Sequence, residues 1–333
     1  MNLSIIIVNY KTPALLLDCL ASVYKYECAG VEIIVVDNDS QDNTLKLLQE
    51  NYPEVIFFQM GYNSGFARAN NAGIKMARSQ VVLLLNSDTI NVNDAINNCY
   101  KKLENSSFIV AGVQLLNADG SPQISGNFAM KGGLNYLLPL PFTGKFLKWI
   151  ADFFKIQKPN VPNAHGTVEV DWINGAFLMV KMKAIKRAGL LDEDFFLYAE
   201  EAEWCGRLKK IGKLCIYGDD HVIHLQGESS ATFFNSQGKG YYNLFDKRGL
   251  QIMLSNFVRM RKQFGIFWFI FNLVFYCITV PVFLIGIIIS GLLKRKHDRY
   301  SILQWKGFTK NVVKLVGYAP KILMNKPYFY KVL

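Results

Sequence analysis

Two acidic side chains stand directly after apolar runs that are typical of buried strands. Asp37 follows residues 31–36, and Asp88 closes an Asn-Ser-Asp tripeptide that follows residues 81–85. Ligands of open α/β sheets bind beyond the carboxyl ends of the strands, so both acids are expected at a binding site. A carboxylate can hold a hard divalent cation that neutralises a diphosphate group, which predicts Asp88 as a metal ligand. Asp37 is predicted to accept hydrogen bonds from a nucleotide base or a ribose. The alternative for both acids is capping of the helix that follows.

A second acidic group opens a helical pattern directly after an aromatic run. It contains Glu200, Glu201 and Glu203. Adjacent carboxylates are costly to bury without a role. A displacement that inverts a sugar carbon needs a general base for the proton of the acceptor hydroxyl, and Glu201 is the first candidate. Glu200 is predicted to bind acceptor or sugar hydroxyls. The alternative is an exposed acidic face that pairs with Arg207 or Lys209.

Two further stretches carry polar groups that suit a phosphorylated ligand. Asn63, a glycine turn and Arg68 stand at a predicted helix start, where backbone N–H groups and a guanidinium can hold phosphate or base. His224 follows a strand-like run, and a neutral imidazole there is predicted to complete the metal site with Asp88. The Gly and Ser residues of 226–230 are predicted to contact phosphate. A capped helix start and a structural histidine are the competing interpretations.

The elements that must position these residues alternate along the chain. Strand patterns cover residues 3–8, 31–36, 55–59 and 81–85, and helix patterns cover residues 12–24, 42–51 and 67–78. Continuous β-branched runs with short helices between them predict a parallel sheet covered on both faces. Residues 117–162 show little periodicity and are predicted to form loops and a short helix on the acceptor side. Regular structure is expected again at residues 168–180, 200–211 and 214–222.

The formal net charge of +11 is concentrated at one end of the chain. Residues 259–333 hold 13 Lys and Arg and one acid, Asp298, so residues 1–258 are close to neutral. A nucleic-acid-binding domain would carry basic residues interleaved with aromatics, and the near-neutral part argues against that function. The six cysteines lack metal-ligand spacing and are expected to be reduced thiols. The N-terminus has the pattern of a strand and not of a signal peptide, so the catalytic part is expected in the cytoplasm.

Residues 264–293 form an uncharged apolar stretch flanked by basic clusters. The stretch is long enough to cross a bilayer once. Basic residues on both sides favour two cytoplasmic ends, and Pro281 and Gly286 can break the stretch into two short helices. A re-entrant or interfacial hairpin is therefore the preferred prediction, with a single span and a buried pair of core helices as alternatives. Beyond it, lysines that recur every four residues from Lys306 to Lys314 predict an amphipathic helix on an anionic leaflet, or a helix that keeps the tail soluble.

Seven motifs together resemble the family 2 inverting glycosyltransferases of the GT-A fold, in particular rhamnosyltransferase-like bacterial members. In order they are SIIIVNYKT, VVDNDSQDNT, NSGFARANNAGIKMA, LLLNSD, DWINGAFLMV, DEDFFLYAEEAEW and HLQGESS. The resemblance implies a Rossmann-like, mostly parallel sheet, a dTDP- or UDP-linked sugar donor, and Mg²⁺ or Mn²⁺ as cofactor. The expected domains are a GT-A domain (1–240), a linker helix (241–262), an apolar membrane segment (263–293) and a basic amphipathic tail (294–333).

The resemblance also implies roles for single residues. Asp88 would bind the metal, His224 would bind the metal or the diphosphate, and Glu201 would be the catalytic base. Trp172, Asn174 and Gly175 match the part of the family that lines the donor-sugar and acceptor cleft. The candidate nucleotide-binding residues are Asn9, Tyr10, Asp37, Asn38, Asn63, Arg68 and Asn86.

Two departures from the family pattern bear on these roles. The metal motif has a single acid where many relatives carry a second one. The acidic motif has Glu-Glu where an Asp is common at the second place, which leaves the base assignment between Glu200 and Glu201.

The expected function is transfer of rhamnose or another hexose from an NDP-sugar to a lipid-linked oligosaccharide or polysaccharide in cell-surface glycan synthesis. The expected location is the cytoplasmic face of the bacterial inner membrane, reached through the C-terminal segment. A membrane scaffold that binds nucleotide sugar without turnover is one alternative. A nucleotidyltransferase is another, although no Gly-rich phosphate loop follows the first predicted strand.

Overall fold

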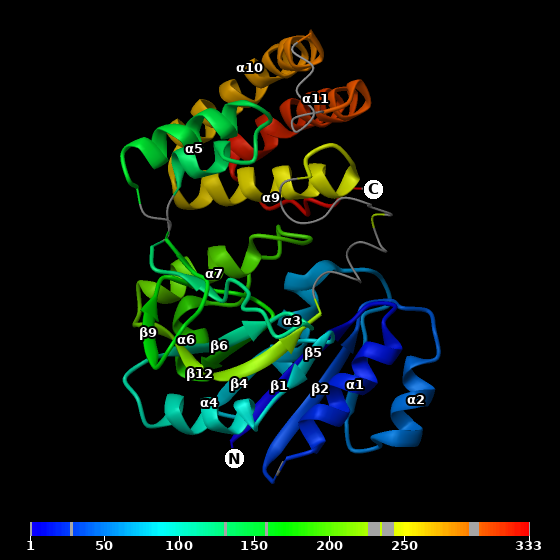
Figure 1. The fold of residues 1–333 in the computed structure, drawn as a ribbon. Helices are drawn as coiled ribbons and strands as arrows, with labels where there is room; N and C mark the ends of the chain where they lie inside the picture. Colours follow the sequence, from blue (N-terminus) through cyan, green and yellow to red (C-terminus); the bar gives the residue numbers. More distant parts are fainter. Residues whose placement is uncertain are drawn as a thin grey trace. The chain divides into compact units, whose positions relative to one another are not determined.

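The computed structural model describes residues 2–26, 29–129, 132–156, 159–225, 234, 243–292 and 300–332. The chain forms two compact units (Figure 1). The first unit contains Met1–Met130, Pro159–Phe196 and Glu200–Ser229, and the second contains Lys131–Lys158, Leu197–Ala199 and Ser230–Leu333. The division expected near residue 240 therefore does not include Lys131–Lys158 and Leu197–Ala199 with the C-terminal segment. The first of these pieces falls within the stretch that the sequence predicted on the acceptor side.

The first unit is built on a nine-stranded sheet. Four neighbouring strands are parallel and follow the order β3 (Ile56–Gln59), β2 (Val31–Asp37), β1 (Leu3–Asn9) and β4 (Val81–Asn86). The sheet continues through β11 (Phe177–Lys181), β6 (Val110–Leu116), β12 (Leu214–His224) and β5 (Thr89–Asn91), with β9 (Thr167–Val170) beside β12. Because β11, β5 and β9 run antiparallel to their partners, the sheet is mixed but mostly parallel, as expected.

Helices cover both faces of this sheet (Figure 1). One apolar layer includes α1 (Pro13–Tyr24), α2 (Thr44–Asn51) and α4 (Ala95–Glu104), and the other includes α3 (Gly65–Met76), α6 (Met182–Ala188) and α7 (Glu200–Lys209). Successive residues of β1 enter opposite layers, Ile5 and Ile7 the first and Ile6 the second. Burial on both faces explains why these strands are continuous apolar runs in the sequence.

The strand register brings the chemically interesting residues to one edge of the sheet. Asn9 pairs with Asp37 between β1 and β2, and His224 pairs with Thr89 between β12 and β5. A second, three-stranded sheet consists of β10 (Trp172–Ile173), β7 (Gly126–Asn127) and β8 (Asn160–Val161).

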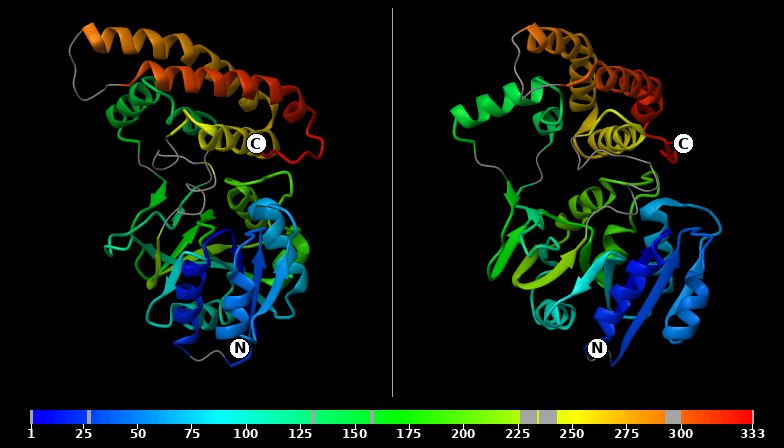
Figure 2. Two further views of the ribbon diagram at one scale, coloured as in Figure 1. Left: turned by 90° about the vertical axis from the view of Figure 1, so that its right-hand side faces the viewer. Right: turned by 45° about the vertical axis from the view of Figure 1, so that its right-hand side comes forward.

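The second unit is helical. It contains η1 (Gly133–Leu137), α5 (Thr143–Phe153), α9 (Lys247–Gln263), α10 (Gly265–Leu292) and α11 (Ile302–Met324). Figure 2 shows α10 and α11 running side by side, and α10 also contacts α9. The linker helix expected at residues 241–262 is thus a packed member of this unit.

The apolar stretch forms one helix and not a helical hairpin. α10 runs unbroken through Pro281 and Gly286, so the break expected there does not occur. Tyr276 and Phe283 pack on both sides of the proline, and this packing offsets the one backbone hydrogen bond that a proline removes. By length and composition Gly265–Leu292 can cross a membrane, and only 17% of its most apolar window is buried. That exposure is inconsistent with a buried core helix.

Candidate functional site

Asp88 and His224 meet at the carboxyl-end edge of the sheet. Asp88 lies in the short connection between β4 and β5, and α4 begins only at Ala95, so Asp88 does not cap a helix. His224 ends β12, and its Nε2 lies 3.4 Å from Asp88 Oδ1 and 3.4 Å from the amide nitrogen of Asn86. Asp88 and His224 are both buried. The two predicted metal ligands are therefore neighbours, although they lie far apart in the sequence.

Gln123 sets the orientation of the His224 ring. The Gln123 side-chain oxygen lies 3.0 Å from His224 Nδ1, and its amide nitrogen donates to the backbone oxygen of His224 across 2.6 Å. A hydrogen on Nδ1 satisfies the first contact, which leaves the lone pair of Nε2 directed toward Asp88. A neutral imidazole held in this tautomer by a polar partner is the form that binds metal ions.

The pair Asp88 and His224 fits a divalent cation that a substrate helps to hold. Among the residues that the structure describes, no group of three or more His, Cys, Asp or Glu side chains is arranged to hold a metal ion. Mg²⁺ is commonly held by one or two carboxylates together with substrate phosphates, and an imidazole beside a carboxylate also suits Mn²⁺. The donor set therefore fits a cation bound together with a diphosphate and not a closed structural site.

Asp37 is held in place by Asn9. The Asn9 amide nitrogen lies 3.1 Å from each of Asp37 Oδ1, Ser40 Oγ and Thr44 Oγ1, and Asn9 is fully buried. The other Asp37 oxygen accepts from the backbone N–H of Ser40 across 2.9 Å. The α2 helix begins at Thr44, so Asp37 shapes the turn after β2 and does not cap α2. Asn9 is thus placed to position Asp37, while Tyr10 beside it is half-buried.

The start of α3 does not offer the phosphate-binding N–H groups that its sequence predicted. Asn38 Oδ1 accepts from the backbone N–H of Ser64 across 2.8 Å, and Asn63 Oδ1 accepts from that of Gly65 across 3.2 Å. The next N–H group, of Phe66, donates to the backbone oxygen of Phe196 across 2.8 Å. Because the protein already uses these three donors, they are not available to a phosphate in this structure, and the binding of phosphate or base by Asn63 and Arg68 stays a prediction.

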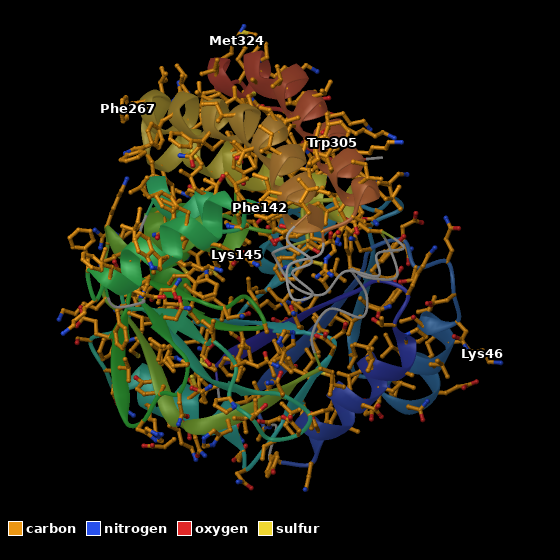
Figure 3. The ribbon with its side chains drawn as sticks, turned by 45° about the horizontal axis from the view of Figure 1, so that its top comes forward. Lys46, Phe142, Lys145, Phe267, Trp305 and Met324 are labelled. Atoms are coloured by element: carbon orange, nitrogen blue, oxygen red, sulfur yellow. The ribbon has the colours of Figure 1, made fainter. Side chains whose placement is uncertain are left out.

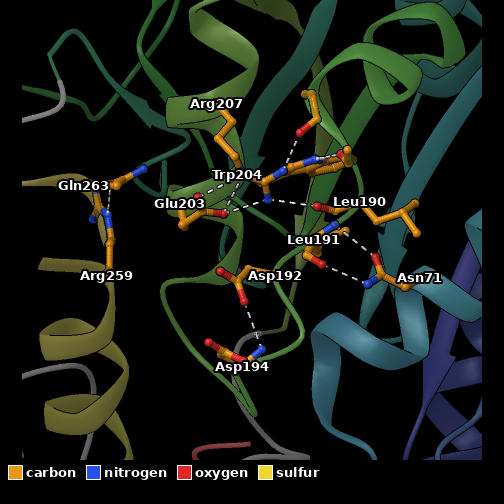
Figure 4. Close-up of polar contacts among 12 residues, drawn as sticks. Asn71, Leu190, Leu191, Asp192, Asp194, Glu203, Trp204, Arg207, Arg259 and Gln263 are labelled. Atoms are coloured by element: carbon orange, nitrogen blue, oxygen red, sulfur yellow. Dashed lines mark hydrogen bonds and ion pairs between the residues drawn. The ribbon is translucent and has the colours of Figure 1, made fainter. Parts of the chain in front are cut away.

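The start of α3 instead holds the segment that leads to the acidic cluster. Asn71 donates to the backbone oxygen of Leu191 and accepts from the N–H of Leu191, across 2.9 and 3.0 Å (Figure 4). Arg68 Nε donates to the backbone oxygen of Glu193 across 3.1 Å. A Cβ atom added at Gly65 would lie 2.2 Å from the Phe196 backbone oxygen, so only glycine permits this approach.

Glu201 occupies the first turn of α7 and is bound by Trp172. The indole N–H of Trp172 in β10 donates to Glu201 Oε1 across 3.2 Å. A Cβ atom added at Gly175 would lie 3.4 Å from Glu201 Cβ and Cγ, so the glycine packs closely against the glutamate side chain. Asn174 makes a local turn, because its Oδ1 accepts from the N–H of Ala176 across 3.0 Å. Trp172 and Gly175 therefore contact the candidate base directly, and Asn174 shapes the turn between β10 and β11.

Glu200 differs from Glu201 in its environment. Glu200 is only 3% exposed, and its buried Oε2 atom has no hydrogen-bond partner among the residues that the structure describes. Burial raises the pKa of the Glu200 carboxyl well above its usual value, and the neighbouring Glu201 carboxylate raises it further. This environment favours the neutral acid at Glu200, which leaves Glu201 as the better candidate for a base.

Glu203 has a structural role. The guanidinium of Arg207 donates to both Glu203 oxygens, across 2.8 and 2.7 Å, and also to the backbone oxygens of Ala188 and Leu190 (Figure 4). Glu203 thus makes the expected pair with Arg207, but it is buried and does not belong to an exposed acidic face. Lys209 pairs with Asp171.

One turn connects Asp88 and His224, the predicted metal ligands, to Glu201, the candidate base. The backbone N–H of Asn86, two residues before Asp88, donates to the backbone oxygen of Ala176 across 3.0 Å. Ala176 follows Gly175, which packs on Glu201. The first unit therefore brings Asp88, His224 and the anchored Glu201 carboxylate together around the end of β4.

Three contributors to this arrangement were absent from the sequence-based predictions. Gln123 lies in a stretch without periodicity, and nothing in the sequence marks it as a partner of His224. Asn71 was visible within the asparagine-rich motif, whereas Glu193 was visible only as one acid among several. Residues 226–230, predicted to contact phosphate, lie outside the described residues.

Residues 4–156 match the family model described as Glycosyl transferase family 2. The chain is 27% identical over 218 residues to the low-salt glycan biosynthesis hexosyltransferase Agl10 of Haloferax volcanii, which covers 63% of this chain and 62% of that protein. It is 24% identical over 262 residues to the N-acetylglucosaminyl-diphospho-decaprenol L-rhamnosyltransferase of Mycobacterium tuberculosis, covering 72% of this chain and 82% of the relative. The chain thus spans less than two thirds of the length of the Haloferax relative.

A solved structure, GalNAc-T7 with UDP, GalNAc and Mn²⁺, superposes with a TM-score of 0.52 at 16% identity, covering 67% of this chain and 43% of that one. This likeness concerns the fold, and it agrees with the mixed, mostly parallel sheet expected for GT-A proteins. The matched family model thus places residues 4–156 of the chain in the family 2 glycosyltransferases, and the seven motifs agree with this assignment.

Proposed function

We propose that the protein transfers a hexose, such as rhamnose, from a dTDP- or UDP-linked donor to a lipid-linked or polysaccharide acceptor, with inversion at the sugar carbon. The observation that carries the proposal is that two candidate cation ligands, Asp88 and His224, and an anchored carboxylate, Glu201, lie together around the end of β4. A sugar transfer of this kind needs charge neutralisation at the leaving diphosphate and a base at the acceptor.

Each residue has a distinct task in this proposal. Asp37, held by Asn9, accepts hydrogen bonds from the nucleoside. Glu201, oriented by Trp172, takes the proton from the acceptor hydroxyl as that oxygen attacks the sugar carbon. Burial raises the pKa of Glu200 and favours its neutral acid, which is suited to donate a hydrogen bond as a carboxylate is not.

Asp88 and His224 would hold the divalent cation. When bound, Mg²⁺ or Mn²⁺ supplies positive charge that stabilises the diphosphate as it leaves. The Mn²⁺ and UDP named with the GalNAc-T7 structure support this cofactor and donor class, because that protein shares the fold.

The acceptor class rests on the relatives and on the second unit. The Mycobacterium relative is named for a decaprenol-linked acceptor, and the Haloferax relative is named for glycan biosynthesis. The exposed apolar helix α10 supports a position at a membrane, where lipid-linked acceptors lie. We place the protein at the cytoplasmic face of the bacterial inner membrane in cell-surface glycan synthesis.

The test offers a panel of dTDP-, UDP- and GDP-hexoses to membranes that contain the full-length protein and measures nucleotide release. Release from a dTDP- or UDP-sugar is expected, with loss on EDTA treatment and recovery with Mg²⁺ or Mn²⁺. Membranes with Glu201→Gln protein are the matched control, and they are expected to bind donor without releasing nucleotide. Donor binding by the wild type without turnover of any sugar would favour the scaffold alternative, and release that is indifferent to EDTA would refute the metal role of Asp88.

A further inference from the structure

Exposed large apolar side chains are concentrated in the second unit. Among the described residues, 27 large hydrophobic side chains are exposed, and 22 of them belong to this unit. Figure 3 shows two of them, Phe267 on α10 and Met324 on α11, projecting outward. Large apolar patches on a protein surface mark contact with another molecule or with a membrane.

Helix α10 is apolar outside and partly polar inside. Its buried residues are Phe269, Asn272, Tyr276, Thr279 and Phe283, which follow the alternating spacing of three and four residues that one helix face requires. The large side chains exposed on the outward face are all apolar. They are Ile266, Phe267, Ile270, Val274, Ile278, Val282, Ile285, Ile288, Ile289 and Leu292. A helix in water shows the opposite arrangement, so the outer face of α10 is suited to lipid.

The inner face of α10 is covered by its two neighbouring helices. Phe257 of α9 packs edge-on against Phe269 and Tyr276, at ring-centroid distances of 5.4 and 5.1 Å. On the other side, Trp305 of α11 donates its indole N–H to the backbone oxygen of Val280 across 3.0 Å. These contacts extend from the first turns of α10 to beyond its middle.

Helix α11 is incompatible with a transmembrane position of α10. α9 ends with Arg259, Arg261 and Lys262, and the exposed residues of α11 include Lys306 and Lys310. The α9 cluster directly precedes the first turn of α10 and would stay at the headgroups in either position. Trp305, however, contacts Val280 in the middle of α10, so a spanning α10 would carry the adjacent Lys306, and Lys310 one turn on, into the hydrocarbon, where lysine is strongly disfavoured. A position in the plane of the interface exposes only the outer face of α10 to lipid and leaves the charged helices at the headgroups.

Helix α5 supplies a second apolar surface in the same unit. Phe146, Trp149 and Phe153 lie on one face at helical spacing, with successive ring centroids 6.1 and 6.2 Å apart, and each is at least 60% exposed. The only buried residue of α5 is Gly144. A helix that exposes a row of aromatic side chains with lysines beside it has the composition of an interfacial membrane helix.

The charge of the second unit complements an anionic bilayer. Its described residues hold fourteen Lys and Arg and two acids, Asp152 and Asp246. On the exposed side of α11, the helical repeat places Val313 and Val316 next to Lys310 and Lys314. Apolar residues beside lysines allow insertion between the acyl chains while the ammonium groups stay among anionic headgroups.

We propose that the second unit is an in-plane anchor on an anionic lipid bilayer, with α10 lying along the interface without crossing it and with the aromatic row of α5 as a second point of insertion. The proposal deepens the membrane-located function proposed above and replaces the single span. Its tests need no sugar transfer, so they can fail while that function stands, and the reverse also holds.

The first test places α10 relative to the bilayer. Cys277 lies near the middle of α10 and is exposed, whereas the other four described cysteines are buried, so a thiol-reactive fluorophore can mark it in a chain with Cys28 replaced by serine. Vesicles of phosphatidylcholine and phosphatidylglycerol carry bromine either high or low on the acyl chains. Stronger quenching by the shallow bromines is expected, and stronger quenching by the deep ones would overturn the in-plane position, because the middle of a spanning helix lies deepest.

A second readout uses inverted membrane vesicles from cells that produce the full chain. Lys262→Cys and Lys306→Cys, each in a chain with Cys28 and Cys277 replaced by serine, flank α10. Both are expected to react with a membrane-impermeant maleimide without detergent. If one of the two reacted only after detergent, α10 would cross the bilayer and the proposal would be wrong.

The contribution of α5 is tested by Trp149→Ser combined with Phe153→Ser. Loss of the two exposed rings is expected to weaken binding to anionic vesicles roughly tenfold, judged from the apolar area removed. The matched control is Phe58→Ser with Phe128→Ser, two exposed aromatics of the first unit, for which unchanged binding is expected. Equal binding by both double variants, or equal binding to vesicles with and without phosphatidylglycerol, would contradict the proposal.

Discussion

Trp172 donates its indole N–H to a carboxylate oxygen of Glu201 across 3.2 Å, from a short strand to the first turn of α7. The neighbouring Glu200 is buried, and within the described part of the chain one of its oxygens has no hydrogen-bond partner. Two adjacent residues of the same type therefore have separate environments. Pairs of titratable groups whose surroundings differ in this way commonly divide acid and base tasks between them.

Replacing Glu201 by glutamine is expected to lower kcat by about 10²- to 10⁴-fold, the usual contribution of a general base. Donor binding should stay close to that of the wild type, because the amide keeps the size of the side chain. Steady-state kinetics and calorimetric titration of the donor measure the two effects. A matched change, Glu200→Gln, should cost less, since glutamine resembles the neutral acid. The reverse order of the two losses would move the base to Glu200.

The stability of the first unit is expected to depend on pH through Glu200. Its pKa is raised in the folded state above the ordinary value of 4.5, so the folded protein binds more protons than the unfolded chain over this range. The free energy of unfolding contributed by this group must then fall as the pH rises from about 4.5 toward its folded-state pKa. Glu200→Gln cannot ionise and lacks this decline. Its thermal midpoint relative to wild type should increase between pH 5 and pH 8, and a constant difference would contradict the burial effect.

Gly65→Ala is expected to lower the free energy of unfolding by about 2 kcal/mol or more, because strain at positive φ combines with a close approach. The φ angle of Gly65 is 76°, and the added Cβ would lie 2.2 Å from the Phe196 backbone oxygen. Gly61→Ala is the matched control. Its φ angle is 75° with nothing within 4 Å, so it should cost only about 1 kcal/mol. Urea unfolding compares the two, and equal losses would show that the Phe196 contact contributes nothing.

Gln123→Met is expected to weaken Mn²⁺ binding about 10- to 100-fold, the usual effect of removing a group that orients a metal ligand. Methionine has a similar length but cannot accept from His224 Nδ1, so the ring loses its fixed orientation. Electron paramagnetic resonance of free Mn²⁺, titrated in the presence of UDP, measures the affinity. Thermal melting without metal reports any general loss of folding. Unchanged affinity in a folded variant would show that Gln123 does not orient a metal ligand.

Tyr198→Phe is expected to lower kcat roughly threefold to tenfold while donor affinity is unchanged, an effect typical of positioning by a single hydrogen bond. Arg248 Nε donates to the Tyr198 hydroxyl across 2.7 Å, and Ser255 donates to the backbone oxygen of Leu197. Tyr198 and Ala199 both have positive φ, a strained arrangement that neighbouring contacts must hold. Tyr62→Phe, at an exposed tyrosine of the first unit, is the control. Equal kcat for both variants would show that the Arg248 hydrogen bond is not needed to hold the tripeptide Leu197–Ala199 before Glu200.

The strands and the site residues at their ends were predictable because they depend on local patterns. Asp37 and Asp88 follow continuous apolar runs, and the carboxyl ends of parallel strands share an edge whatever the loops do. The structure places both acids at this edge, each outside a helix cap. Their roles in binding remain predictions.

Other features depend on contacts between distant segments, which a local pattern does not contain. The three-residue strand β5 brings Thr89 beside His224, yet its length is too short for a periodic signal. The start of α3 has the composition of a phosphate loop, but Asn38 and Phe196, both distant in sequence, occupy its N–H groups. Pro281 predicted a break in α10, and tertiary packing of the rings around it overrides that local tendency.

The chain enters the second unit at Lys131 and at Leu197 before it stays there from Ser230 onward. No single cut can separate the two units, and a protein shortened at residue 240 would keep Leu197–Ala199 but lose the arginine and serine that bind this tripeptide. Exchange of the C-terminal helices between relatives, as a means of moving such an enzyme to another surface, must therefore carry the matching tripeptide with it.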